Sequence, residues 1–265
     1  MHTQSERILS EVKKAIVGKD DVLARALMAI LSRGHILLED VPGVGKTTLA
    51  LAFSRAMGIE YRRVQFTPDV VPSDILGFSI YDKETGNLVY KPGAVMCNLL
   101  LADEINRTSS KTQSALLEVM EERQVSIDGV THALPDPFLV IATQNPVGAA
   151  GTQLLPQAQL DRFMARLKMG YPDFNSQVRI LRDRKGENPL NQVSQAVDAA
   201  AVRRMQGEVD SLNVADSIYE YITHLAQATR EHAVVQLGVS PRGDLCLPSD
   251  ASNELWLREI EELKR

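Results

Sequence analysis

The chain has 265 residues, of which 44% are hydrophobic, and a formal net charge of −5. This length can bury a sizeable core in one large or two modest domains, and the acidic balance gives no overall electrostatic reason to bind nucleic acid. The two cysteines, Cys97 and Cys246, suggest neither a disulfide framework nor a metal-ligand spacing. Residues 1–6 lack a charged and then apolar leader, and no apolar run is long enough to cross a bilayer. We therefore expect a cytoplasmic protein without membrane insertion.

The first predicted elements are two helices followed by a strand. Apolar residues recur at helical spacing from Ile8 to Ile16, and a break at Gly18 precedes a second helix at residues 20–32. The apolar run Ile36-Leu37-Leu38 then predicts a buried strand.

A phosphate-binding loop is predicted directly after this strand, and it consists of Pro42, Gly43, Val44, Gly45, Lys46, Thr47 and Thr48. Glycines let backbone N–H groups close on the β- and γ-phosphates, Lys46 places a positive charge there, and the hydroxyl of Thr47 is a ligand for Mg²⁺. The N-terminus of the following helix adds partial positive charge. The strict motif has a glycine where this chain has Asp40. The alternative is a glycine-containing turn that binds nothing.

Two hairpins are predicted to interrupt the alternation of strands and helices. The first lies between residues 77 and 95, around Thr85-Gly86-Asn87, and the second spans residues 124–133, around Asp128-Gly129.

Between these hairpins, a buried strand at residues 98–102 leads into Asp103 and Glu104. Asp103 can hold Mg²⁺ through water, which leaves Glu104 to orient and deprotonate an attacking water. The alternative is a strand that merely runs into an acidic turn.

A third strand at residues 138–143 ends in Gln144-Asn145-Pro146, and Asn145 could position the same water. Asn145 could equally be a turn former before proline. Strands and helices alternate as far as Tyr171, which predicts a parallel sheet with helices on both faces.

Only helices are predicted after Pro172, at residues 177–185, 198–209 and 214–232, and they are typical of a small helical lid beside a nucleotide. In Ser240-Pro241-Arg242 a serine cap and a proline begin another helix. Arg242 would then reach the γ-phosphate if the lid folds over it. A plain helix start with a solvated arginine is the alternative.

The order of these motifs resembles the MoxR family of AAA+ ATPases from about residue 6 to residue 242. The resemblance rests on the phosphate loop together with Asp103-Glu104-Ile105-Asn106-Arg107, Ala142-Thr143-Gln144-Asn145-Pro146, Gln159-Leu160-Asp161-Arg162-Phe163 and Ser240-Pro241-Arg242. It implies that Asn145 is sensor 1, Arg162 the arginine finger and Arg242 sensor 2, and that Val17 and Gly18 lie against the adenine. Members commonly carry an acidic residue at the position of Asp40. A surface ion pair between Asp161 and Arg162 is the alternative for that segment.

The predicted elements and the resemblance together give the expected domain organisation. Residues 1–172 would form an AAA+ nucleotide-binding α/β core with a parallel sheet, flanking helices and two hairpin insertions, and residues 173–250 the helical lid. Relatives usually continue into further lid helices, whereas Gly243 breaks the helix here, so the lid is expected to be abbreviated. Residues 251–265 would form a charged tail helix of uncertain origin.

The implied activity is Mg²⁺-dependent hydrolysis of ATP in a hexameric ring that remodels protein partners as a chaperone does. The implied cofactors are ATP and Mg²⁺, and the partner class includes von Willebrand factor A domain proteins. The hairpins would project toward the ring's pore, or they could be inert surface decorations. A nucleic-acid motor and a slow ATP-binding switch remain open alternatives, because the ATPase core is shared among these classes.

Overall fold

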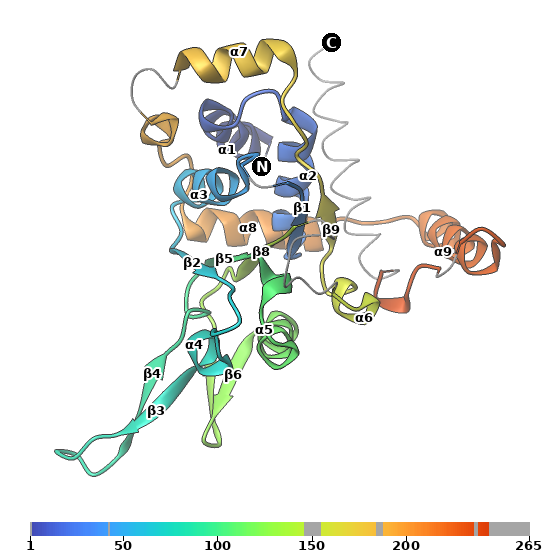
Figure 1. Ribbon diagram of the computed structural model, residues 1–265. Coiled ribbons are helices and arrows are strands. Elements are labelled where there is room, and N and C mark those ends of the chain that lie inside the picture. Colours follow the sequence, from blue (N-terminus) through green and yellow to red (C-terminus); the bar gives the residue numbers. More distant parts are fainter. Residues whose placement is uncertain (1, 42, 146–154, 184–187, 236–237, 244–265) are drawn as a thin grey trace.

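The computed structural model describes residues 2–41, 43–145, 155–183, 188–235 and 238–243 (Figure 1). Its first half contains α1 (His2–Ala15), α2 (Asp20–Leu31), β1 (Ile36–Glu39), α3 (Lys46–Met57), β2 (Tyr61–Gln65), α4 (Pro72–Leu76), β3 (Gly77–Tyr81), β4 (Leu88–Pro92), β5 (Leu99–Asp103) and α5 (Ser110–Glu122). Its second half contains β6 (Gln124–Ile127), β7 (Val130–Ala133), β8 (Leu139–Gln144), α6 (Gln157–Leu160), β9 (Ala165–Leu167), α7 (Phe174–Asp183), α8 (Ala199–Asp210) and α9 (Asp216–Glu231). Within this described part, no helix combines the length and apolarity needed to cross a membrane.

The central sheet has five parallel strands in the order β2-β5-β8-β1-β9. This arrangement confirms the predicted α/β fold with a parallel sheet. Parallel strands end at the same edge of a sheet, and ligands of open α/β sheets bind outside that edge. The edge gathers Glu39 of β1, Asp103 of β5 and Gln144 of β8.

Alternation along the strands divides the interior into two cores, one on each face of the sheet. In β5, Leu99 and Leu101 pack with residues of α1, α2 and α3, whereas Leu100 and Ala102 pack with residues of α4 and α5. All four side chains are fully buried. A strand that is covered on both faces has apolar residues at successive positions. This continuous apolar run is the pattern that predicted β5 from the sequence.

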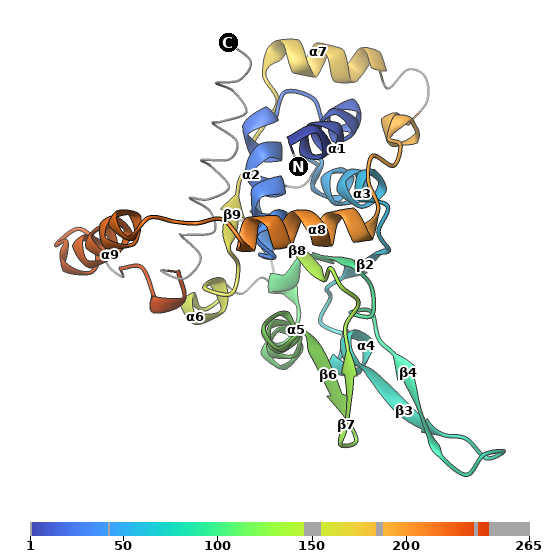
Figure 2. The same ribbon diagram turned by 180° about the vertical axis from the view of Figure 1, so that it is seen from behind.

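Both predicted hairpins are present, and they extend together away from the sheet (Figure 2). The β3–β4 hairpin pairs Gly77 with Pro92, and the β6–β7 hairpin pairs Gln124 with Ala133. The rings of Tyr90 in β4 and His132 in β7 stack with centroids 3.9 Å apart. The two insertions therefore contact one another through an aromatic pair.

The helices after β9 occupy three separate places in the described structure. Helix α7 begins three residues before its predicted start, because the carboxylate of Asp173 accepts hydrogen bonds from the backbone N–H and hydroxyl of Ser176. Helix α8 packs on α2 and contributes Val202 and Met205 to the core on the face of the sheet that α1, α2 and α3 cover. Helix α9 stands to the side (Figures 1 and 2). The domain boundary at residue 172 stays a prediction, and the tail at residues 251–265 lies outside the described residues.

Candidate functional site

The predicted phosphate loop joins the end of β1 to the start of α3. Gly45 immediately precedes the helix with φ 98°, and Gly43 has φ 87°, a region that favours glycine. No atom lies within 4 Å of a Cβ built on Gly43, so the backbone there is open to a ligand. Backbone N–H groups at a helix N-terminus attract anions such as phosphate. Pro42, assigned to the loop from sequence, lies outside the described residues.

Asp40 replaces the first glycine of the strict motif, and its side chain has a structural use. Its carboxylate accepts hydrogen bonds from the backbone N–H of Val41, at 2.9 Å, and from that of Gly170, which follows β9. The departure from the motif thus ties the loop to the segment that leads into α7.

The ammonium group of Lys46 lies at the centre of the site. It is buried, and Nζ donates to the backbone O of Asp40 at 2.7 Å and to Oδ1 of Asn145 at 3.3 Å. Burial lowers the pKa of Lys46, and the carboxylates of Asp103, Asp40 and Glu104 act in the opposite direction. Lys46 is therefore a buried side chain at the phosphate loop, and the carboxylates around it favour its charged form.

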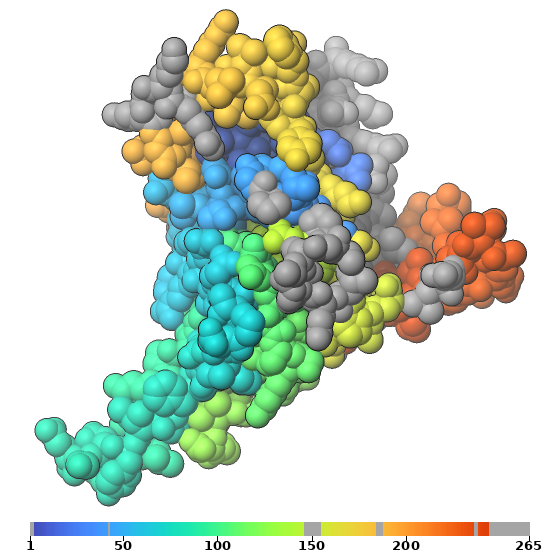
Figure 3. Space-filling model, in the orientation of Figure 1, coloured from blue at the N-terminus to red at the C-terminus, as the bar shows by residue number. Residues whose placement is uncertain are grey.

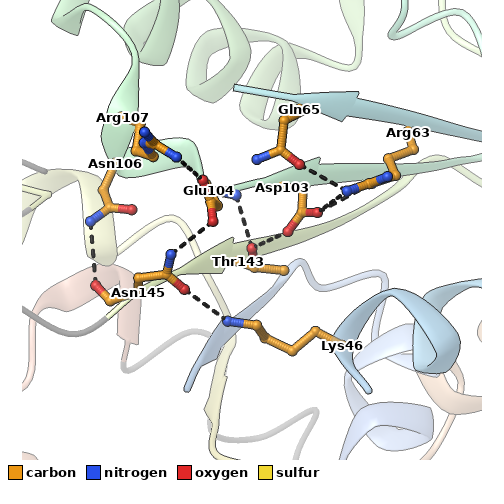
Figure 4. A network of polar contacts seen from close by, with 9 residues as sticks. All are labelled: Lys46, Arg63, Gln65, Asp103, Glu104, Asn106, Arg107, Thr143 and Asn145. Atoms are coloured by element: carbon orange, nitrogen blue, oxygen red, sulfur yellow. Dashed lines mark hydrogen bonds and ion pairs between the residues drawn. The ribbon is translucent and has the colours of Figure 1, made fainter. Parts of the chain in front are cut away.

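Asp103 ends β5 with both carboxylate oxygens engaged (Figure 4). Oδ1 accepts a hydrogen bond from Oγ1 of Thr143 in β8, at 2.6 Å. Oδ2 accepts one from Nη2 of Arg63 in β2, at 2.7 Å, and the strand order makes this contact possible because β2 adjoins β5.

Glu104 adopts a left-handed backbone conformation, with φ 57° and ψ 47°. The hydroxyl of Thr143 accepts its backbone N–H at 2.9 Å and helps to hold this conformation. Its carboxylate accepts hydrogen bonds from Nη1 of Arg107, at 2.7 Å, and from Nδ2 of Asn145, at 2.8 Å. The hydrogen bond from Arg107, followed by that from Asn145, lowers the pKa of Glu104 although burial opposes the shift. Glu104 is therefore ionised at neutral pH and able to accept a proton.

Asn145 connects the two halves of the site. Its amide contacts Lys46 through Oδ1 and Glu104 through Nδ2, so the side chain spans from the phosphate loop to the acidic strand (Figure 4). Its backbone O accepts a hydrogen bond from Nδ2 of the buried Asn106, at 3.4 Å. The structure thus brings together the four residues that the sequence selected from three different strand ends.

A cavity of about 370 Å³ opens beside the phosphate loop. Gly43, Val44, Gly45 and Thr48 line it on one side, and half-buried Thr47 lies in the same first turn of α3. The opposite wall comes from residues before α2 and after β9, namely Lys14, Ala15, Ile16, Val17, Lys19, Met169, Tyr171, Pro172, Gln177, Ile180, Leu181, Asp183, Asn188 and Pro189. Its mixed apolar and polar wall suits a nucleotide base and sugar.

The family resemblance implies that Val17 and Gly18 both lie against the adenine. Val17 lines the cavity, whereas Gly18, with φ 70°, packs against α7: a Cβ there would lie 2.1 Å from Oγ of Ser176. The sequence did not identify Met169, Tyr171 and Ile180 as residues that line the cavity. No spacing in the chain predicts that α7 and the segment before it lie beside the phosphate loop.

Arg162 and Arg242 lie together but away from this cavity. Arg162 Nε is 3.2 Å from the carboxylate of Glu121 in α5, and Nη2 of Arg242 pairs with the same carboxylate. The alternative from sequence was an ion pair between Asp161 and Arg162. The carboxylate of Asp161 instead accepts a hydrogen bond from Oγ of Ser240 at 2.6 Å. That bond fastens the Arg242 segment to the turn after α6. Arg242 therefore lies beside Arg162 and does not line the cavity at the phosphate loop, and its role at a nucleotide stays a prediction.

Known proteins share both the sequence and the fold. Residues 35–165 match the family described as "ATPase family associated with various cellular activities (AAA)". Over 247 residues the chain is 48% identical to the uncharacterized protein YeaC of Bacillus subtilis (strain 168), covering 93% of this chain and 77% of that protein. It is 43% identical over 249 residues to Chaperone MoxR1 of Mycobacterium tuberculosis, covering 91% of this chain and 66% of that protein. The chain belongs to the MoxR family of AAA+ ATPases.

A solved structure described as a "putative ATPase" from Cytophaga hutchinsonii supports the same assignment, with a TM-score of 0.88 and 37% identity over 99% of this chain and 84% of that one. The MoxR family membership confirms the predicted fold class and the predicted activity class, an ATPase with an AAA+ α/β core. An AAA+ ATPase binds nucleotide, and the phosphate loop with the adjoining cavity is the candidate site for it.

Proposed function

We propose that this MoxR-family ATPase couples Mg²⁺-dependent hydrolysis of ATP to chaperone-like remodelling of protein partners in a ring. One observation carries the proposal: the chain of contacts from Lys46 through Asn145 to Glu104, with Asp103 beside it, at the mouth of the phosphate loop. Phosphoryl transfer relies on positioning and charge stabilisation, and these residue types supply both.

The chemistry of the nearby donors fits Mg²⁺. Asp103 offers a buried carboxylate and Thr47 a hydroxyl, and Mg²⁺ prefers such oxygen ligands together with water and phosphate oxygens. When bound there, Mg²⁺ would neutralise charge on the β- and γ-phosphates.

The remaining steps belong to side chains. Lys46 holds the β- and γ-phosphates by charge, Asn145 orients the attacking water, and Glu104 accepts its proton. Glu104 is suited to this role because its carboxylate is ionised at neutral pH and because Asn145, which also contacts Lys46, holds it in place by a hydrogen bond.

We assign Arg162 and Arg242 to the nucleotide of a neighbouring subunit. Both are partly exposed, both contact Glu121, and neither lines the cavity beside the phosphate loop of the described chain. An arginine so placed can stabilise the transferred phosphoryl group only after subunits assemble. Because neither arginine lines the cavity of its own chain, the arrangement favours a ring of subunits, and the family resemblance indicates that this ring is a hexamer.

The two hairpins are the proposed contact with protein substrates. Exposed apolar side chains concentrate on β3 and β4, where Phe78, Tyr81 and Leu88 are 51%, 64% and 62% exposed. Figure 3 shows the β3–β4 hairpin projecting beyond the body of the molecule. The name of Chaperone MoxR1 supports protein remodelling as the task. A von Willebrand factor A domain protein as partner follows from the family resemblance alone.

Steady-state hydrolysis tests the proposal. The rate should require Mg²⁺, disappear in EDTA, and rise on addition of an unfolded model protein. Stimulation by DNA or RNA but not by protein would instead indicate a nucleic-acid motor. A rate that no macromolecule changes, with ATP retained for many minutes, would indicate a slow ATP-binding switch.

A further inference from the structure

Arg63 makes a contact with Asp103 that the hydrolysis scheme does not use. It lies in β2, the edge strand of the sheet, and its Nη2 and Nε are 2.7 and 3.2 Å from Oδ2 of Asp103. Nη2 also lies 2.8 Å from Oε1 of Gln65. The register explains the geometry, because Arg63 lies opposite Leu101 and Gln65 opposite Asp103, so these side chains share one face of the sheet.

This ion pair occupies the carboxylate proposed to hold Mg²⁺. Oδ1 of Asp103 already accepts the hydroxyl of Thr143, and Oδ2 carries the guanidinium. A guanidinium and a divalent cation repel one another, and each is stabilised by the same negative charge. Simultaneous binding of the Arg63 guanidinium and Mg²⁺ to the carboxylate of Asp103 is therefore unfavourable.

The side chain of Arg63 can move away from Asp103. Its side chain is 46% exposed, whereas that of Asp103 is 12% exposed, so the arginine is the partner that can leave. Arg63 also borders a hollow of about 530 Å³ at the root of the β3–β4 hairpin, lined in addition by Ser73, Asp74 and Phe78. Its guanidinium can turn into this hollow and remain hydrated without displacing buried groups.

We propose that Arg63 is a positioning residue that competes with Mg²⁺ for Asp103. In the metal-free protein it neutralises the buried carboxylate, and it withdraws from Asp103 when Mg²⁺ arrives with the nucleotide. Arg63 thus sets how much Mg²⁺ the site requires. This inference rests on the proposed role of Asp103 in holding the metal.

The test is the Mg²⁺ dependence of nucleotide binding, measured with a fluorescent ADP analogue so that no turnover occurs. Arg63→Gln removes the competing charge and should lower the Mg²⁺ concentration for half-maximal binding by about two- to fivefold, the size of a partly exposed charge interaction. Arg63→Lys keeps the charge and should remain near the wild-type value. Arg25→Gln is the matched control, because Arg25 is another exposed arginine in an ion pair, with Asp21, and it does not border the hollow.

Thermal unfolding supplies a second readout. Arg63→Gln should lower the melting temperature in EDTA, where the ion pair exists, and leave it unchanged in saturating Mg²⁺ and ADP, where the pair is already broken. A raised Mg²⁺ requirement, or an unchanged one, would overturn the inference while leaving the proposed function intact. Mg²⁺-independent binding of the ADP analogue by the wild-type protein would also overturn the inference, whereas the proposed function would fail only if hydrolysis itself did not require Mg²⁺.

Discussion

At the scale of single residues, Glu104 shows how the site is built around a strained backbone. A non-glycine residue in the left-handed region costs of order 1–3 kcal/mol and persists where surrounding contacts hold it. Thr143 makes two of these contacts at once, since its hydroxyl accepts the N–H of Glu104 and donates to Asp103. One side chain from β8 therefore positions both Asp103, which ends β5, and Glu104, which follows it.

The division of roles between Lys46 and Glu104 gives the first prediction. Lys46→Ala removes a charge from the phosphates and should weaken nucleotide affinity by about 10- to 100-fold, the range of a charge-assisted hydrogen bond of about 1.5–3 kcal/mol. Glu104→Gln should leave affinity nearly unchanged and reduce turnover by about 10²- to 10⁴-fold, as expected for loss of a general base. Fluorescent-nucleotide titrations and single-turnover hydrolysis measure the two effects separately. Equal losses of affinity in both variants, with unchanged hydrolysis per bound ATP, would exclude Glu104 as the base.

Sequence predicted these residues because of where they stand in their strands. Lys46 and Asn145 come after buried strands and Asp103 ends one, and the ends of parallel strands meet at one edge. The contact between Arg63 and Asp103 depends instead on β2 lying next to β5, and no spacing in the chain encodes that order. The same limit applies to Asp40, whose partner Gly170 lies beyond β9.

At the scale of elements, His35, which directly precedes β1, links this strand to β8 and α5. Its ring is buried, with Nδ1 accepting the N–H of Val140 in β8 and Nε2 lying 3.0 Å from the backbone O of Met120 in α5. Both ring nitrogens therefore have partners when the ring is neutral and Nε2 carries the proton. A protonated ring could not accept from Val140.

Stability should consequently depend on the charge of His35. Burial lowers its pKa from 6.5 to about 4, while the hydrogen bond to Met120 opposes the shift. The unfolded chain binds a proton below pH 6.5 and the folded chain only near pH 4, so the free energy of unfolding should fall as pH decreases between these values. The slope approaches about 1.4 kcal/mol per pH unit, and the total is about 3 kcal/mol.

Urea denaturation of the wild-type and His35→Asn proteins between pH 7 and pH 4.5 measures this contribution. The variant should be less stable at pH 7 but should lose the extra slope below pH 6.5. His224→Asn on exposed helix α9 is the control and should keep the wild-type slope. Parallel pH profiles for wild type and His35→Asn would contradict the prediction.

The hairpins provide a second prediction at this scale. The stacked rings of Tyr90 and His132 should add about 0.5–1.5 kcal/mol to the local stability of each hairpin. Tyr90→Leu should therefore speed hydrogen exchange of the β6–β7 amides by about two- to tenfold. Tyr90→Phe keeps the stacked ring and should exchange as slowly as wild type, and Tyr81→Leu, at an exposed position of the same hairpin, should have no effect on β6–β7. Equal exchange in Tyr90→Leu and wild type would show that the hairpins move independently.

At the scale of the whole molecule, Arg162 and Arg242 lie away from the phosphate loop of the same chain. Helix α9 stands apart from the sheet, and the segment that follows it returns to α6 through the bond between Ser240 and Asp161. Arg162 and Arg242 consequently converge on Glu121, which neutralises part of their charge in the single chain. If a neighbouring nucleotide receives these arginines, its phosphates replace Glu121 as the partner, and each active site draws on two subunits.

Mixtures of inactive variants test this arrangement for both arginines. Lys46→Ala keeps its arginines and Arg162→Ala keeps its phosphate loop, so a mixed ring contains interfaces with one intact loop and one intact finger. Hydrolysis should return in that mixture, because a finger contributes about 10³- to 10⁵-fold to the rate. A co-assembled mixture as inactive as its components would exclude a role for Arg162 across the subunit boundary.

The same logic decides where Arg242 acts. When Arg162→Ala is mixed with Arg242→Ala, an Arg242 that serves the neighbour leaves every interface with at most one of the two arginines, so activity should remain low. An Arg242 that serves its own nucleotide would restore both arginines at some interfaces, and activity would return. The structure predicts the first result, because Ser240 holds Arg242 beside Arg162 on Glu121 rather than beside its own phosphate loop. Recovery in this mixture, with co-assembly demonstrated by light scattering, would show that the lid closes over its own site after all.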